Sequence, residues 1–353
     1  MIELKTKMLV LVLITILGLS IGYSALNTDL SISGDAEFIV SYDIAKNKIL
    51  NDNGGANYIE SRETPDFSKT ANTDEGMFAT LDNDGTSYYY RGAVDNNWLY
   101  FAGYYWRVVR VNGNGSIRLI YNGTTANQTG IDTQISLDGS TVEYQFNLDY
   151  SLSEYAGLKY TVGEQHGTSQ KSNALEVLDS WYARNLLSYE DFIDDFSGFC
   201  NDRETYIGTG IGSNDTFFAL WDRLRVNRNP SLKCSNILDN FTSSKSNVGN
   251  RSLQYPIGML TADETAFAGA VATDNNSQLV KSNFYLNSGQ RYWLMTPYCI
   301  YDAMVRGTYI SENGELSGPH VAGYCGIRPV INLKANIMLS GNGTADNPYK
   351  IVD

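Results

Sequence analysis

The chain has 353 residues, with 26 basic against 39 acidic side chains and a net charge of −13. Phosphate binding relies on clustered Lys and Arg, and no such cluster occurs, so nucleic acids and anionic membrane surfaces are excluded as favoured partners. Aromatic residues are abundant, with 25 Tyr, 5 Trp and 13 Phe. Aromatics beyond the needs of a core supply contact surface at low entropic cost.

The N-terminus has the pattern of an export signal. Lys5 and Lys7 precede an apolar run from Met8 to Leu17, and small residues follow, which is the order found in secretory signals. Residues 1–25 are therefore predicted to be a signal peptide or an N-terminal membrane anchor, and the protein to be secreted or held at the cell surface. No later apolar stretch is long enough to span a bilayer, so membrane contact is expected only through residues 8–26.

Residues 26–50 are predicted to form an N-terminal strand segment. Apolar and polar residues alternate from Asn27 to Val40 around Gly34, which indicates a strand pair or a bulged strand. The next stretch, 51–83, is rich in Asn, Asp, Ser, Thr and Gly and is interpreted as loops. From residue 51 to 353 we expect one disulfide-stapled α+β globular domain.

The strongest strand signals of the chain come next, in Tyr88–Tyr90, Trp98–Ala102, Tyr104–Val111 and Ser116–Tyr121. The segment Asn112–Gly115, with the sequence NGNG, predicts the tight turn of a hairpin, because Asn-Gly tolerates the positive backbone angles that such turns need. Three arginines interrupt the apolar pattern of these strands and are interpreted as edge or solvent-facing residues: Arg107, Arg110 and Arg118.

Two segments have helical spacing, and each begins with a capping-box pattern. Asn173 precedes Glu176 by three residues, and Thr261 stands in the same relation to Glu264. The C-terminal third returns to short strands at Arg291–Pro297, Ala303–Ile310 and Gly326–Leu333. Few helices and many short strands joined by Gly- and Asn-rich turns predict an α+β fold with mainly antiparallel sheet.

The four cysteines are Cys200, Cys234, Cys299 and Cys325. An even number in an exported protein favours two disulfides, for which the sequence permits three pairings. We expect the sequential pairing, Cys200–Cys234 and Cys299–Cys325, because it closes two loops of moderate length. A zinc site is the rival interpretation, but no C-x-x-C pair occurs and the chain has only 2 histidines.

The segment GYSALNTDLSISGDAEF (Gly22–Phe38) resembles the N-termini of exported Gram-positive proteins of the TasA/camelysin type. From Gly85 to Lys334, stretches such as YYWRVVRVNGNGSIRLIYNG, LDSWYARNLLSY, LTADETAFAG and GIRPVINLK resemble secreted proteins of Firmicutes and related bacteria. The first resemblance implies export through a dedicated signal peptidase. The second implies secretion and carries no particular activity.

A more distant resemblance concerns the C-terminal third. YWLMTP, a hairpin and a final GIRPV strand are similar to the closing segment of C-type-lectin-like domains of the formylglycine-generating kind. In the enzymes of that group a cysteine follows the Gly-aromatic-Arg element and supports copper-dependent oxidation. Here Pro329 follows Arg328, and Cys325 lies three residues earlier, out of register with that pattern. The resemblance therefore implies a C-type-lectin-like fold and not the oxidase chemistry.

Catalytic and metal-binding patterns are weak throughout. His166 and His320 lie in loop-like stretches and are interpreted as solvated loop residues. The acidic group Asp191, Asp194 and Asp195 is interpreted as a solvated turn, although two carboxylates facing each other would suit a glycoside hydrolase. We therefore expect no enzyme activity and no cofactor.

The segment Asp82–Thr86, DNDGT, resembles half of a calcium loop. It lacks a bidentate Glu at the end, since residue 93 is Ala93. Asp82 and Asp84 are therefore interpreted as turn residues, and no metal site is predicted.

Together these patterns favour an exported bacterial binding or adhesion protein with a C-type-lectin-like domain and an extracellular glycan or protein ligand. The candidate ligand contacts are Trp98, Tyr104, Tyr292 and Trp293. Arg328 lies in an apolar strand and is predicted to have a carboxylate or backbone-carbonyl partner, because an unpaired buried charge is costly. The alternatives are a structural component of a matrix or fibre, and a carboxylate-dependent hydrolase.

Overall fold

The computed structural model describes residues 30–32, 38–40, 43–244, 247–272 and 281–352. The chain divides into two compact units, Met1–Asp43 and Ile44–Asp353. In the first, β1 (Leu30–Ile32) pairs antiparallel with β2 (Phe38–Val40), which confirms the predicted strand pair. The candidate export signal lies outside the described residues. Among those that are described, no helix is both long and apolar enough to cross a membrane.

The larger sheet of the second unit has the strand order β19-β7-β6-β5-β21-β20, and β4 joins β3 to β6. Its strands are β3 (Asp74–Leu81), β4 (Thr86–Gly92), β5 (Trp98–Phe101), β6 (Tyr104–Val111), β7 (Ile117–Tyr121), β19 (Val330–Leu333), β20 (Met338–Ser340) and β21 (Tyr349–Val352). The hairpin of β6 and β7 turns at NGNG, as the sequence predicts, and Gly115 there has a φ of 85°.

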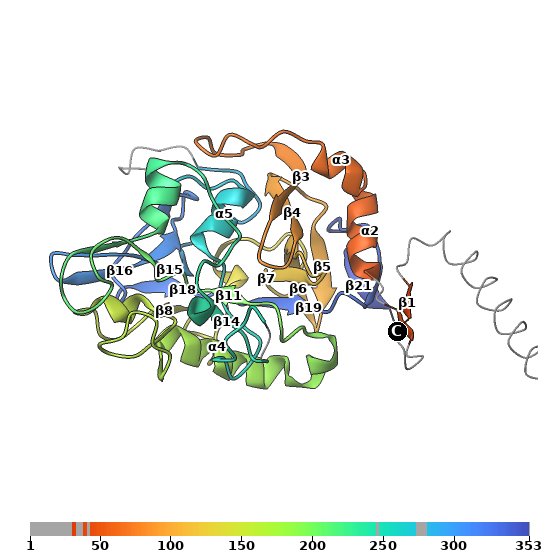
Figure 1. The fold of residues 1–353 in the computed structure, drawn as a ribbon. Helices are drawn as coiled ribbons and strands as arrows, with labels where there is room; N and C mark the ends of the chain where they lie inside the picture. Colours follow the sequence, from red (N-terminus) through yellow and green to blue (C-terminus); the bar gives the residue numbers. More distant parts are fainter. Residues whose placement is uncertain (1–29, 33–37, 41–42, 245–246, 273–280, 353) are drawn as a thin grey trace, which may run out of the picture. The chain divides into compact units, whose positions relative to one another are not determined.

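The smaller sheet has the order β12-β13-β15-β16-β17, and β18 pairs both with β15 and with β8. Its strands are β8 (Glu143–Gln145), β12 (Thr205–Ile207), β13 (Thr216–Phe218), β15 (Tyr292–Tyr301), β16 (Met304–Ile310), β17 (Leu316–Ser317) and β18 (Tyr324–Gly326). Figure 1 shows β15, β16 and β18 in blue, with the green β8 beside them. The C-terminal segment passes from this sheet at β18 to the larger one at β19, and Arg328 lies at the crossing.

Short elements complete the second unit. Two strand pairs are β9 (Lys159–Tyr160) with β10 (Gln170–Lys171), and β11 (Phe199–Cys200) with β14 (Asn240–Phe241). The helices are α2 (Ile44–Asp52), α3 (Ala56–Glu60), α4 (Asn173–Asn185) and α5 (Ala262–Ala268). Single helical turns are η2 (Gly130–Thr133), η3 (Ser153–Ala156), η4 (Leu187–Phe192), η5 (Trp221–Val226) and η6 (Ile237–Asp239).

This is the α+β, mainly antiparallel fold that the sequence predicts. Among the described strands, parallel pairing occurs only between β5 and β21 and between β15 and β18, and two isolated parallel bridges join Asp82 to Leu232 and Ala272 to Leu316. Helix α5 packs against both β4 and β15, so it joins the two sheets (Figure 1). Its capping box, Thr261 with Glu264, is present as predicted.

Two local predictions need correction. Residues 44–52 form α2 and belong to the second unit, and α3 and β3 lie within the stretch 51–83 that the composition indicated as loops. The cap of α4 is Ser172 and not Asn173, because the Ser172 side chain accepts a hydrogen bond from the Leu175 amide at 3.2 Å. Serine and asparagine are about equally favoured at the N-cap, so the sequence pattern alone did not distinguish Ser172 from Asn173.

The interpretation of three strand arginines as edge or solvent-facing is wrong, since Arg107, Arg110 and Arg118 are all buried. The reason is twofold: β6, which carries Arg107 and Arg110, and β7, which carries Arg118, are paired on both edges. Other segments also cover the faces from which these side chains project, such as α5 with Glu264 over Arg110 and Arg118. Arg107 stacks on the Trp98 ring at 4.1 Å and donates to the Val94 carbonyl at 2.6 Å. Burial lowers its pKa to about 9.

Arg110 and Arg118 meet the same carboxylate. Glu264 lies 3.1 Å from Arg110 Nε and 2.5 Å from Arg118 Nε, and its side chain is almost fully buried. Asp82 supplies the second anion, with Oδ2 at 2.9 Å from Arg110. The charges that interrupt the strand pattern thus form a closed interior network between the larger sheet and α5.

Candidate functional site

The four aromatic residues predicted as ligand contacts do not form a surface. Trp98, Tyr292 and Trp293 are buried, and Tyr104 is half-buried, with its hydroxyl donating to Asn185 Oδ1 at 2.7 Å. Adjacent strand residues point to opposite faces, but here both faces of β15 are covered at this point. The Arg328 guanidinium lies 5.0 Å from the Tyr292 ring centre, and Phe146 packs on Trp293 at 5.7 Å. Burial excludes Trp98, Tyr292 and Trp293 as ligand contacts, and this prediction is wrong for them.

A different set of aromatic side chains does line a concave surface, at the other end of β15. This aromatic groove has a volume of about 370 Å³ and is lined by Phe217, Trp221, Arg225, Tyr298, Cys299, Tyr301, Arg306, Ser317 and Gly318. Ligand sites usually combine an apolar, aromatic lining with a few convergent polar groups in a volume of roughly 300–1,000 Å³. The groove has both properties.

Strand register brings the members of the groove together. Phe217 on β13 pairs with Cys299 on β15, and Cys299 pairs with Arg306 on β16. Paired residues of neighbouring strands share a face of the sheet, so these three side chains form a row across it. Tyr301 lies two residues beyond Cys299 and joins the same face, where its side chain is 55% exposed.

A β-bulge adds Tyr298 to this face. The register of β15 with β16 shifts between the pairs Pro297–Gly307 and Cys299–Arg306, which leaves Tyr298 as the extra residue. Bulges redirect side chains in this way and are common beside functional sites. Gly318 packs directly against the ring, because a Cβ at that position would lie 2.2 Å from Tyr298 Cδ1. Glycine at 318 therefore leaves room for the Tyr298 ring.

The wall of the groove is the π-helical turn η5, which directly follows β13. Trp221 meets Phe217 edge-on with ring centres 4.5 Å apart and Tyr298 at 5.3 Å. The Arg225 guanidinium lies 4.3 Å from the Trp221 ring centre and donates to the Tyr298 hydroxyl. Single π-helical turns occur frequently at functional sites, and this one places an indole and a guanidinium on the same side.

Arg306 supplies the positive charge on the opposite side. It is half-buried, and its guanidinium donates to the Gly318 carbonyl at 3.3 Å. No carboxylate of the described residues forms an ion pair with it. The Cys299 thiol at the floor is uncharged, because burial raises its pKa to about 11 against the opposing effect of Arg306 and Arg225.

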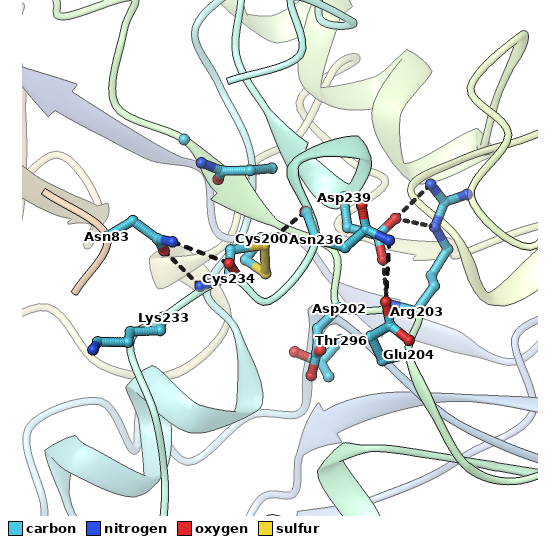
Figure 2. The surroundings of a disulfide bond; sticks show 12 residues. Asn83, Cys200, Asp202, Arg203, Glu204, Lys233, Cys234, Asn236, Asp239 and Thr296 are labelled. Carbon is cyan, nitrogen blue, oxygen red and sulfur yellow. Dashed lines mark hydrogen bonds and ion pairs between the residues drawn. A yellow bond between two sulfur atoms is a disulfide. The ribbon is translucent and has the colours of Figure 1, made fainter. Parts of the chain in front are cut away.

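The predicted disulfide between Cys200 and Cys234 is confirmed, with an S–S distance of 2.05 Å. Figure 2 shows how the bonded segment is held: the Asn83 amide donates to the Cys234 carbonyl at 3.0 Å and accepts from the Cys234 amide at 2.6 Å. The disulfide therefore fastens the segment after η5 to β11, and the two Asn83 hydrogen bonds hold the same segment against the turn between β3 and β4.

The second predicted disulfide is wrong, since Cys299 and Cys325 are free and buried. Parallel pairing of β15 with β18 places Gly326 opposite Tyr292, so Cys325 lies near the start of β15. Cys299 is seven residues further along that strand, or roughly 20 Å at about 3.3 Å per residue. Disulfides need Cα atoms within about 7 Å.

The Asp82 turn is confirmed. Oδ1 accepts the amides of Asp84 and Gly85 at 2.8 and 3.0 Å, while Oδ2 accepts the Gly113 amide at 2.8 Å and Arg110. Both oxygens of this carboxylate thus hold the turn and the arginine. The pKa of Asp84 is raised, first by burial and then by Asp82.

A second hollow lies between this turn, the disulfide and α5, but it holds only about 50 Å³. Most of its charges are paired: Glu264 with Arg110 and Arg118, Asp82 with Arg110, and Arg223 with Asp202 and Asp263. A hollow of this size is far below the roughly 300–1,000 Å³ of a typical ligand site, so we interpret it as part of an interior ion-pair network.

His166 is not a solvated loop residue, which corrects the sequence interpretation. Its Nδ1 lies 3.1 Å from Asp239 Oδ2, and its Nε2 lies 3.7 Å from Glu204. Asp239 is fully buried and also binds Arg203, as Figure 2 shows. The hydrogen bond to Asp239, opposed by burial, raises the pKa of His166.

His320 is half-buried. Its ring centre lies 4.2 Å from that of Tyr150, and burial lowers its pKa.

The acidic group near residue 194 is engaged locally. Asp194 is buried and accepts the Ser197 amide at 2.9 Å, while Asp195 accepts the Ser244 hydroxyl. Burial raises the pKa of Asp194 against these hydrogen bonds. Each of the two carboxylates accepts a hydrogen bond from a different serine. This arrangement gives no support to the alternative of a carboxylate-dependent hydrolase.

The Arg328 prediction is confirmed. The side chain is buried and donates to the carbonyls of Tyr121 at 3.1 Å and Leu286 at 2.9 Å, and to Asn122 Oδ1 at 2.7 Å. These bonds fix the crossing between the two sheets. Arg328 is a structural residue, as its place in an apolar strand indicated.

The sequence analysis predicted no member of the aromatic groove as a ligand contact, and it named Cys299 only as a disulfide partner. A local signal existed, since Phe217, Trp221 and Arg225 follow one another at intervals of four residues. Comparison of the chain with family models, with curated proteins and with solved structures gives no match.

Proposed function

We propose that this chain is an exported binding protein, secreted or held at the cell surface, which captures an extracellular glycan or protein ligand in the aromatic groove. The observation that carries the proposal is the set of partly or well exposed aromatic side chains on one concave face, Phe217, Trp221 and Tyr301, with the buried Tyr298 ring beneath them. Aromatic faces take up flat apolar surfaces of a ligand, and polar groups at the rim orient it.

The exposure of Tyr301 supports the proposal. At 55% exposed it contributes little to the core, yet its ring lies 6.5 Å from that of Phe217 and extends the aromatic lining outward. The lectin-like resemblance of the C-terminal third favours the same function. A C-type-lectin-like classification of the fold is part of this proposal.

A glycan array and a protein array probed with the purified full-length chain test the proposal. Tyr301→Ala is expected to abolish or strongly weaken binding to any ligand found. Tyr324→Ala is the matched control, since Tyr324 is 57% exposed and lies outside the groove. Equal loss in both variants, or none in either, would exclude the groove as the binding site.

A second candidate is a matrix or fibre component, in which the N-terminal strand pair adds to a neighbour's sheet. The support for it is that β1 and β2 form a two-stranded sheet in their own unit, and strand edges are templates for β-addition. Concentration-dependent polymers that disappear in Ser31→Pro would favour assembly, because proline removes a ladder donor. A species that stays monomeric at all concentrations would count against it.

A further inference from the structure

The charge distribution of the aromatic groove constrains what it binds. The chain as a whole carries a net charge of −13. The described lining of the groove nevertheless contains two guanidinium groups, Arg225 and Arg306, and no carboxylate. Asp215 acts on the Cys299 thiol from outside the lining, but more weakly than Arg306 and Arg225 do, so the field at the floor of the groove is positive. A concave surface with a positive field concentrates anionic ligands, even on a protein whose net charge repels them.

The two guanidinium groups differ in what they already bind. Arg225 stacks on Trp221 and donates to the Tyr298 hydroxyl, so it holds the wall in place. Arg306 makes one long hydrogen bond, to the Gly318 carbonyl at 3.3 Å.

Arg306 differs from the six arginines of this unit that have a carboxylate partner: Arg91, Arg110, Arg118, Arg203, Arg223 and Arg291. It also differs from Arg107 and Arg328, which lack such a partner among the described residues but are buried and donate several hydrogen bonds to carbonyl and amide oxygens. A half-buried guanidinium without such a partner is the natural receptor for a ligand carboxylate, which it binds with two parallel hydrogen bonds.

The position of Arg306 relative to the rings specifies the ligand further. Arg306, Cys299 and Phe217 form a row across three strands, with Arg306 at one end and Phe217 at the other. The rings of Trp221 and Tyr301 lie beside Phe217, with ring centres 4.5 and 6.5 Å from it. A pyranose ring has an apolar face for aromatic stacking and polar groups around its edge. A sugar that also carries a carboxylate on that edge would meet both halves of the groove at once.

We therefore propose that the groove binds an acidic glycan, with the ring of a uronic acid on the Trp221 and Tyr301 side and its carboxylate on Arg306. This inference rests on the proposed binding function and names its ligand class. An acidic peptide offers the carboxylate on a flexible chain without a rigid ring face, so it fits the aromatic side less well.

The test is a binding titration of the full-length chain with three labelled probes: an oligogalacturonate, the same oligosaccharide with its carboxyl groups reduced to alcohols, and an oligoglutamate peptide. The oligogalacturonate is expected to bind about tenfold or more tightly than its reduced counterpart, because a charge-assisted hydrogen bond is lost on reduction. Rising salt concentration is expected to reduce the difference in affinity between the oligogalacturonate and its reduced counterpart, because salt screens the charge interaction.

Variants locate the effect. Arg306→Gln is expected to bind both oligosaccharides with the affinity of the wild type for the reduced one, and Arg306→Lys to recover part of the preference. Arg251→Gln removes one exposed positive charge outside the groove and is expected to change nothing. Equal melting temperatures of the variants show that the fold is intact.

The outcomes separate the two proposals. If both oligosaccharides bind equally well and Arg306→Gln has no effect, the acidic-glycan inference fails while the binding function stands. If the oligoglutamate binds as tightly as the oligogalacturonate, the glycan class is wrong. If none of the probes binds, the inference is overturned, and the array screen decides whether the proposed binding function falls with it.

Discussion

Replacing Glu264 by Gln removes the charge on which the interior of the larger sheet depends. The carboxylate is 3% exposed, accepts the Thr261 amide at 2.9 Å and pairs with Arg110 and Arg118. Glutamine has nearly the same shape and keeps an oxygen for the capping bond. The substitution therefore isolates the charge and leaves two buried guanidinium groups with Asp82 as their remaining anion.

The expected cost is large. Removing one partner of a buried ion pair destabilises a protein by about 3–5 kcal/mol, because the other charge remains buried and uncompensated. Folded proteins have a total stability of only about 5–15 kcal/mol. A more solvent-accessible pair supplies the control: Arg291 and Glu143 lie 3.0 Å apart with side chains 44% and 35% exposed, so Glu143→Gln is expected to cost at most about 1 kcal/mol.

The effect also depends on pH. Burial opposes ionisation of Glu264, but Arg118 and Arg110 outweigh it and hold its pKa below the ordinary value of 4.5. Because the folded pKa is lowered, the contribution of Glu264 is complete above about pH 4.5 and is lost as pH falls through the folded pKa. The difference between wild type and Glu264→Gln should therefore shrink on acidification.

Urea unfolding at neutral and at acidic pH measures these quantities. A loss of less than about 1 kcal/mol at neutral pH, or a difference that is constant down to acidic pH, would refute the interior-network reasoning.

The other predictions are as follows. Cys234→Ala is expected to lower the free energy of unfolding by about 4 kcal/mol, the loop-entropy value for a bond across 34 residues; thiol titration of the denatured, unreduced wild type should find Cys299 and Cys325 free, and finding no thiol would contradict the pairing. Arg328→Met should cost about 3 kcal/mol or more by urea unfolding, since the carbonyl of Leu286 and its neighbours lose their donor; an unchanged midpoint would disprove the bridging role. The raised pKa of His166 means that its contribution to stability is present below about pH 6.5 and lost as pH rises through the folded pKa, so His166→Gln should flatten the melting profile across that window; identical profiles would contradict it.

Local features of the fold were predictable from the sequence. The NGNG turn, the Thr261 capping box and the buried, bonded Arg328 each depend on residues close together in the chain or on burial within one strand. The strands β4 to β7, β15, β16 and β19 likewise follow from local alternation and turn residues, whereas β3 lies in a stretch whose composition indicated loops. These features predict an α+β fold without any knowledge of which strands pair.

The errors have a common physical cause, which is dependence on register between distant segments. Burial of Arg110 requires a carboxylate 154 residues away, on α5. The predicted Cys299–Cys325 disulfide is wrong because β18, which carries Cys325, pairs with the start of β15, whereas Cys299 lies near its end. Because adjacent strand residues point to opposite faces, one of Tyr292 and Trp293 was expected at the surface. Segments from elsewhere in the chain cover both faces of the strand, so both side chains are buried.

The aromatic groove was missed for the same reason. It forms only when β13 lies beside β15 and when the bulge at Tyr298 turns that ring toward Trp221. Neither the strand pairing nor the bulge has a signature in the local sequence. The four-residue spacing of Phe217, Trp221 and Arg225 is the one local signal of the groove.

The central claim is that ligand binding occurs at the groove formed by β13, η5, β15 and β16. Hydrogen–deuterium exchange of the full-length chain, with and without the tightest ligand from the array screen, tests it most directly. We expect slower exchange in residues 216–226 and 298–306 when the ligand is bound, and no comparable change around Glu190 and Asp195. Protection confined to segments outside 216–226 and 298–306 would contradict the claim.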